Sequence, residues 1–146
     1  ALDNYSPNHI ELINGLGVLP GRTIRWSIAD TVREKGFNFA IVVHPTAVLS
    51  DDVVLESGVQ VMAGCVVQSG VKVGCDSVIN TGALVDHDCT IERQCWISPG
   101  TTICGQVKLG ERVYVGAGAT IIQQISVCQG TLIMAGTTVV EDITGS

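Results

Sequence analysis

An apolar residue recurs at every sixth position along the last two thirds of the chain. Stepping by six from Leu49, sixteen positions in a row to Val139 carry only leucine, isoleucine or valine. A second series starts four residues later, at Val53, and its sixteen members to Ile143 are smaller on average and uncharged. No insertion breaks either series, and no α-helix has a six-residue apolar period. The pattern predicts a repeat in which each six-residue unit is one short strand and a turn.

Three such units would form one triangular coil. The branched residue of each unit would fill the interior, and the smaller one would let the chain turn the corner. Stacked coils lie about 4.8 Å apart, so the sixteen units give about five coils in a prism roughly 25 Å long. Residues 46–146 are therefore predicted to form an all-β-dominated parallel β-helix. Glycine, which tolerates positive φ, recurs at the turns, at Gly58, Gly64, Gly70, Gly100, Gly118, Gly130 and Gly136.

The first 45 residues lie outside this repeat. Ile10–Val18 is predicted to be a short strand that runs into a glycine turn, and Arg22–Lys35 a helix that stops at Gly36. Phe37–Val43 is predicted to be a second strand. The order describes a partial β-α-β, Rossmann-like unit. The glycines at 15 and 17 are too few to form the nucleotide-binding loop that normally follows the first strand of such a unit.

Composition narrows the classes of partner. The chain is 46% hydrophobic but only 4% aromatic, so its core must consist of small and branched residues. A formal charge of −6 argues against nucleic acid as a partner, because phosphate binding needs a basic surface. There is no apolar run of about 18 residues to span a membrane, and no signal peptide is recognisable. The expectation is a soluble, cytoplasmic protein with no membrane partner.

The six cysteines do not have the spacing of a metal site. No two are separated as C-x-x-C, and no cysteine–histidine cluster has zinc-finger spacing. Cys65, Cys89 and Cys95 fall on the small interior position of the repeat. They are predicted to be small buried hydrophobic residues in a reducing compartment, with no metal bound.

Four segments carry a resemblance to a known family: INGLG at 13–17, VVHPTAVLS at 42–50, INTGALVDHDCTI at 79–91 and SPGTTICGQVKLGERVYVGAGATI at 98–121. They resemble the hexapeptide-repeat, left-handed β-helix acyltransferases of the sialic acid O-acetyltransferase and UDP-amino-sugar N-acetyltransferase group. The resemblance implies a left-handed coil, acetyl-CoA as acyl donor, a small-molecule sugar acceptor and a homotrimer. Members of the group have a complete N-terminal nucleotide-sugar domain, of which this sequence contains only part.

Acyl transfer from a thioester needs a base, donors for the developing oxyanion and a groove that aligns the reactants. Of the three histidines, His9 is predicted to be incidental, and His44 is predicted to be a cap or a packing residue at the start of the prism. His87 lies in a turn between Asp86 and Asp88, and an adjacent carboxylate can fix its tautomer and favour its imidazolium. The resemblance implies that His87 is the general base and that Asp88 raises its basicity.

Two further residues are candidates for the same site. Asn80, in the preceding unit, matches a polar active-site residue of the family, although an asparagine is also common in turns. Gly105 follows His87 by three units, or one coil, so it should be stacked one strand spacing away on the same corner. The resemblance supports its amide as the oxyanion donor, and an ordinary turn glycine is the alternative.

The acetyl-CoA contacts of the family map by position onto Trp96, Ala117 and Ala135. The two alanines are three units apart, which predicts one corner in adjacent coils, where small side chains would keep a groove open for pantetheine. Tight turns alone could also demand small residues there. Trp96 replaces a residue that is histidine in some relatives, which predicts an apolar contact.

The expected function is acetyl-CoA-dependent transfer of an acyl group to an amino or hydroxyl group of a sugar. A truncated, non-catalytic relative that serves as a structural or interaction module is the alternative. A zinc enzyme of the γ-carbonic anhydrase type would need three converging histidines, and His87 is the only histidine within the prism proper.

Overall fold

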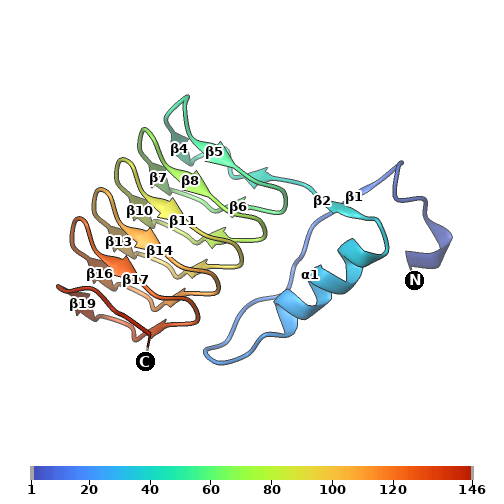
Figure 1. Cartoon of the computed structure of the whole chain (residues 1–146). Coiled ribbons are helices and arrows are strands. Elements are labelled where there is room, and N and C mark those ends of the chain that lie inside the picture. Colours follow the sequence, from blue (N-terminus) through green and yellow to red (C-terminus); the bar gives the residue numbers. More distant parts are fainter. Residues whose placement is uncertain (1, 146) are drawn as a thin grey trace.

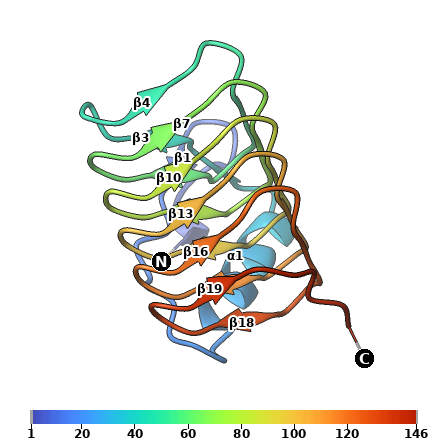
Figure 2. The ribbon, with the colours of Figure 1, turned by 90° about the vertical axis from the view of Figure 1, so that its left-hand side faces the viewer.

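The computed structural model describes residues 2–145 and has two parts, a triangular prism and a small unit on its side (Figure 1). The prism is a parallel β-helix of about five coils with three flat sheets as its faces, which confirms the fold class predicted from the sequence. Strands of one face come from successive coils and pair in parallel, always with a partner three units along the chain, as in Leu84 with Thr102. Figure 2 shows the prism from the side, with the strands of one face stacked one above another.

Each strand contains only two residues, and the three faces are named here by their strands. Face I consists of β3 (Val42–Val43), β6 (Gln60–Val61), β9 (Val78–Ile79), β12 (Trp96–Ile97), β15 (Tyr114–Val115) and β18 (Leu132–Ile133). Face II consists of β4 (Val48–Leu49), β7 (Val66–Val67), β10 (Leu84–Val85), β13 (Thr102–Ile103), β16 (Thr120–Ile121) and β19 (Thr138–Val139). Face III consists of β5 (Val54–Leu55), β8 (Lys72–Val73), β11 (Thr90–Ile91), β14 (Lys108–Leu109) and β17 (Ser126–Val127). The corners between them are corner I/II, corner II/III and corner III/I.

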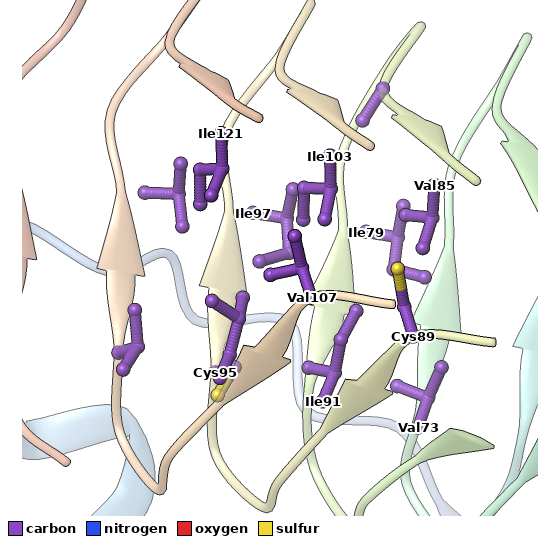
Figure 3. Close-up of a cluster of buried hydrophobic side chains, with 14 of the residues drawn as sticks. Val73, Ile79, Val85, Cys89, Ile91, Cys95, Ile97, Ile103, Val107 and Ile121 are labelled. Carbon is purple, nitrogen blue, oxygen red and sulfur yellow. The ribbon is translucent and has the colours of Figure 1, made fainter. Parts of the chain in front are cut away.

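The second residue of each strand points into the prism, because neighbouring side chains of a strand alternate between its two sides. Figure 3 shows Ile79 and Ile97 from face I beside Val85, Ile103 and Ile121 from face II. All five are at most 1% exposed. The small residues of the second series fill the corners from inside, and the three cysteines predicted there, Cys65, Cys89 and Cys95, are fully buried free thiols. Burial raises the pKa of Cys89 to about 11 and that of Cys95 to about 12, so both are unreactive.

After the first two turns of the prism, each turn contains a residue with positive φ. From Gly58 to Gly136 this conformation recurs at each sixth residue, as predicted for the turn glycines. A residue with a side chain pays of order 1 kcal/mol in this region, yet six of the positions are not glycine. These are Asp76, Asp88, Gln94, Gln106, Arg112 and Gln124.

The N-terminal unit contains a 3-10 turn (Leu2–Asn4), a two-stranded parallel sheet of β1 (Glu11–Leu12) and β2 (Asn38–Phe39), and helix α1 (Ile24–Glu34). Helix α1 lies along the prism at corner III/I (Figure 1). Charged pairs join them there: Arg33 contacts Asp76 at 2.8 Å, and Asp30 contacts Arg93 at 2.9 Å. The helix agrees with the predicted range apart from two residues at its start and one at its end.

The strand predictions for this unit were wrong in extent. Only Glu11–Leu12 of the first predicted strand is extended in a sheet. The second, Phe37–Val43, is two strands: β2 pairs with β1, whereas β3 pairs with β6 and belongs to face I. Val43 stands one unit before Leu49, so the repeat starts one unit earlier than the sequence series, and the chain changes sheets between Phe39 and Val42.

The register of the prism can be tested within one strand. Val73 is 1% exposed and Lys72, its neighbour in β8, is exposed. Val73→Asp should destabilise the protein by several kcal/mol, because an unpaired carboxylate would be buried. Lys72→Asp introduces the same side chain on the outside and should have little effect. Thermal unfolding of both variants measures the difference, and equal melting temperatures would contradict the register.

Candidate active site

His87 lies on the outside of corner II/III, in the turn between β10 and β11. Its side chain is 54% exposed, and its Nδ1 lies 2.9 Å from Oδ2 of Asp88. Its backbone N–H donates to Oδ1 of Asp86 at 2.8 Å, so both neighbouring carboxylates hold this residue in place. The prediction that His87 points outward between two carboxylates is confirmed.

The contact with Asp88 determines which ring nitrogen is available. An ionised carboxylate can only accept a hydrogen bond, so Nδ1 carries the proton and Nε2 presents its lone pair to solvent. The hydrogen bond to Asp88 raises the pKa of His87 above its usual value, and the charge of Asp86 adds to this effect against some desolvation. The imidazole is therefore oriented and made more basic by its neighbour.

Two glycines in the adjacent coils make room for this pair. A Cβ on Gly105, one coil after His87, would lie 2.5 Å from Nε2 of the ring. A Cβ on Gly70, one coil before Asp88, would overlap with Oδ1 of that carboxylate. The structure thus gives Gly105 a steric role that the sequence did not suggest. Gly70 was missed as a site residue, although its position three units before Asp88 is a signal that could have identified it.

Asp88 reaches the ring because its backbone is left-handed, with φ at 57°. Its amide donates to the carbonyl of Ser69 at 2.9 Å in the preceding coil. This left-handed conformation costs a non-glycine residue of order 1 kcal/mol. The conformation directs the carboxylate of Asp88 back toward His87.

The amide of Gly105 lies beneath the ring of His87 in a buried residue and has no acceptor within the chain that the structure describes. Among the hydrogen bonds of residues 2–145, none is donated by this N–H, whereas the next amide, that of Gln106, donates to the carbonyl of His87 at 2.8 Å. The amide belongs to a residue that stacks beside the imidazole, so a donor and a base come together at one corner. This placement agrees with the predicted position of Gly105.

Asn80, Ala117 and Ala135 lie on a different corner, corner I/II. The two alanines are in adjacent coils, as predicted, and Gly136 donates its N–H to the carbonyl of Ala117 at 2.9 Å. Oδ1 of Asn80 accepts a hydrogen bond from the amide of Thr81 at 2.8 Å, which is the turn geometry that was the alternative for this residue. One prism therefore does not bring these three residues next to His87.

Corner I/II is lined by glycine at every positive-φ position. All six residues with side chains in this conformation occur on the other two corners, so positive φ does not by itself require glycine. Apart from the two chain neighbours, a Cβ on four of the five glycines would meet no atom of the described residues within 4 Å, and on the fifth only one atom at 4.0 Å. The row leaves open space along the whole corner: Gly64, Gly82, Gly100, Gly118 and Gly136.

Trp96 does not lie on corner I/II. It is the outward residue of β12 on face I, and the guanidinium of Arg25 stacks over its ring at 5.6 Å. Its role in coenzyme A binding stays a prediction. His44 is hydrogen-bonded through Nδ1 to Oγ1 of Thr46 at 2.9 Å at the first turn of the prism, as expected of a cap, and His9 is exposed.

Over the described ranges, no three His, Cys, Asp or Glu side chains are grouped closely enough to hold a metal ion. Helix α1 is too short to cross a bilayer, and no other helix in residues 2–145 is long and apolar enough to do so.

The hydrogen bond from His87 to Asp88 can be tested by titration. Asp88→Asn replaces the acceptor carboxylate by a neutral amide, so the pKa of His87 should fall toward its ordinary value. Asp86→Asn is the matched control, because Asp86 contacts only the backbone of His87 and contributes less. NMR titration of the imidazole measures both, and an equal decrease in the two variants would contradict the assigned contact.

Comparison with known proteins gives a family match for part of this sequence. The bacterial transferase hexapeptide family (six repeats) matches residues 88–123, which begin at Asp88 and include Gly105. Among curated protein sequences, none matches the chain closely enough to count as a relative.

Solved structures give closer matches. The acetyltransferase domain of PglB from Neisseria gonorrhoeae is 33% identical with a TM-score of 0.89, and the match covers 98% of this chain and 69% of that one. The same domain in complex with acetyl coenzyme A is matched at 30% identity and a TM-score of 0.78, over 97% of this chain and 68% of that one.

A variant of perosamine N-acetyltransferase from Caulobacter crescentus, in complex with CoA and GDP-perosamine, is 35% identical with a TM-score of 0.82. That match covers 86% of this chain, which spans 60% of the length of the perosamine enzyme. The repeat and the match to the PglB domain, which covers 69% of that structure at 33% identity, together show that this chain belongs to the hexapeptide-repeat transferase family.

Proposed function

We propose that the protein transfers an acetyl group from acetyl-CoA to an amino or hydroxyl group of a nucleotide-linked sugar. The observation that carries the proposal is the pairing of His87 with Asp88 beside the free amide of Gly105. Relatives support the substrates, since one is bound to CoA and GDP-perosamine and another to acetyl coenzyme A. Acetyl-CoA supplies the thioester, and the residues of the chain supply a base, an oxyanion donor and a groove.

His87 acts as the general base through Nε2. As the acceptor nitrogen or oxygen attacks the thioester carbonyl, Nε2 takes its proton and the ring becomes an imidazolium facing Asp88. The N–H of Gly105 donates to the oxyanion of the tetrahedral intermediate. When the carbon–sulfur bond breaks, the imidazolium returns the proton to the thiolate, so the products are the acetylated sugar and CoA.

Coenzyme A is proposed to lie along corner I/II, next to Ala117 and Ala135. The row of five glycines there leaves space that none of residues 2–145 fills, although the same backbone conformation carries Asp, Gln and Arg elsewhere. A close approach from outside, by pantetheine or by a neighbouring prism, explains why glycine occupies every positive-φ position of this corner.

The base and the coenzyme groove meet if three copies assemble through face II. Its outward residues are all uncharged, whereas face III carries two lysines and face I is partly covered by the N-terminal unit. Face II is flanked by corner I/II on one side and by corner II/III on the other. When three prisms turn face II toward a common axis, corner II/III of each copy comes beside corner I/II of the next. The uncharged residues are Val48, Val66, Leu84, Thr102, Thr120 and Thr138.

Replacing the base tests the activity directly. His87→Ala should lower kcat by about 10²–10⁴-fold in an acetyl-transfer assay with nucleotide-linked amino sugars and sialic acids. Acetyl-CoA binding and the melting temperature should stay unchanged, because the side chain points to solvent. His44→Ala is the control and should keep full activity. If the unsubstituted protein binds acetyl-CoA but acetylates no acceptor, a non-catalytic module would be the better account.

The pH profile should follow the raised pKa of His87. The base works as the neutral imidazole, so kcat/KM should rise with pH through a midpoint above the ordinary value for histidine. Asp88→Asn removes the main cause of the shift and should move this rising limb to lower pH. A limb that stays in place in the variant would exclude His87 as the titrating group.

Blocking the corner tests the groove. Ala117→Leu adds a branched side chain to corner I/II and should weaken acetyl-CoA binding at least about tenfold, as measured by calorimetry. Gln129→Leu makes the same side chain at the equivalent turn position of corner III/I and should bind as before. Sedimentation of both variants distinguishes a blocked groove from a lost assembly. If Ala117→Leu assembles normally and still binds acetyl-CoA as tightly as the unsubstituted protein, coenzyme A does not bind at corner I/II.

A further inference from the structure

A cavity lies on face I, away from His87, between the prism and the loop that precedes α1. It has a volume of about 210 Å³ and is called here the tryptophan cleft. Three aromatic residues line it: Trp26 from α1, and Trp96 and Tyr114 from neighbouring strands of face I. The loop over Val18–Thr23 forms its other wall. This volume is below the roughly 300 Å³ of ordinary small-molecule pockets, so the cleft can hold about one ring.

The walls of the cleft are positively charged. Arg22 and Arg112 both line it, in a protein whose net charge is −6. No acidic residue lines the cleft among those described, and Asp30, outside its lining, pairs with Arg93 and lies 3.6 Å from Nη2 of Arg112. Among the ion pairs of residues 2–145, none includes Arg22.

Helix α1 adds to this positive potential. It begins at Ile24, directly after the loop, with no acidic residue in its first turn. The side chain of Thr23, at its N-cap, makes no capping hydrogen bond. The amides of Trp26 and Ser27 donate to the carbonyl of Thr23. Those of Ile24 and Arg25 make no hydrogen bond among residues 2–145 and lie at the positive end of the helix dipole. An anion in the mouth of the cleft would meet these amides together with Arg22.

Arg25 lies behind the rings of the cleft. Its guanidinium is 5.3 Å from the centre of the Trp26 ring and 5.6 Å from that of Trp96, and the residue is 2% exposed. Nη1 donates to the carbonyls of Asn14 and Leu16, whereas Nε and Nη2 are buried without a partner in the described structure. Burial lowers its pKa to about 10, so it keeps its charge at neutral pH. Arg25 forms no ion pair among residues 2–145, and the charge of Asp76 offsets its burial only in part, so this region favours a further negative charge.

We propose that the tryptophan cleft binds a small anion that carries one flat aromatic ring, with the ring among Trp26, Trp96 and Tyr114 and the anionic group at Arg22. A nucleoside monophosphate and an aromatic carboxylate share this chemistry. Ring contacts with aromatic side chains and charge contacts with arginine would both contribute. The site is separate from corners I/II and II/III, so it does not depend on the proposed acetyl transfer.

The protein contains its own reporter for this ligand. Its two tryptophans, Trp26 and Trp96, both line the cleft. Titration with uridine monophosphate and with benzoate, corrected for absorption by the ligand, should give a saturable change in tryptophan fluorescence for at least one of them, and their relative affinities distinguish the two sources. Uridine, which lacks the charge, and inorganic phosphate, which lacks the ring, should each bind at least about tenfold more weakly.

Substitutions at the mouth of the cleft complete the test. Arg22 is exposed, so Arg22→Gln should leave the fold intact and weaken binding at least about tenfold, and Arg22→Lys should restore part of it. Lys72→Gln, on face III, is the control and should bind like the unsubstituted protein. A response that never saturates with either ring-bearing anion, equal binding of uridine and uridine monophosphate, or unchanged affinity in Arg22→Gln would each overturn the proposal.

Discussion

The structure depends on one constraint, the stacking of every residue on the residue three units away. Each coil must repeat the same three corners. From Gly58 to Gly136, every sixth residue therefore adopts a left-handed backbone, and the second residue of each strand points into the interior. The hydrogen bonds between coils then hold the side chains of one corner in a column. A residue on the outside of a corner is therefore defined by three neighbours: its own turn, the coil before and the coil after.

The candidate base illustrates what such a column can achieve. Asp88 contacts the ring of His87 because Asp88 has a left-handed backbone, a conformation that glycine would adopt at a lower energy. The pair then fits because Gly70 and Gly105 lie above and below it. The coil before and the coil after thus contribute space, and Gly105 also contributes a free amide. The geometry of the candidate site therefore depends on two glycines, each one coil away from the residue that it accommodates.

Much of this could be predicted from the sequence because, in a regular repeat, the number of a residue determines its face, its corner and its coil. The interior residues, the outward direction of His87 and the shared corner of Ala117 and Ala135 all follow from counting by units or by whole coils. The N-terminal unit could not be predicted as well, since strands of two residues have no periodic signature and the chain changes sheets after Phe39. The stacking of Arg25 on Trp96 joins residues far apart in sequence, outside any repeat. Steric reasons for glycine also stay hidden until side-chain positions are known.

The central claim is that the base on corner II/III of one copy works with the groove on corner I/II of the next. Two variants, each defective on one corner, test it: His87→Ala and Ala117→Leu are produced together so that mixed assemblies form. An interface that takes His87 from the second variant and Ala117 from the first has both corners intact. The account predicts that mixed assemblies regain a substantial fraction of acetyl-transfer activity that neither variant has alone. Activity no higher than that of the separate variants, in assemblies confirmed to contain both chains, would contradict it.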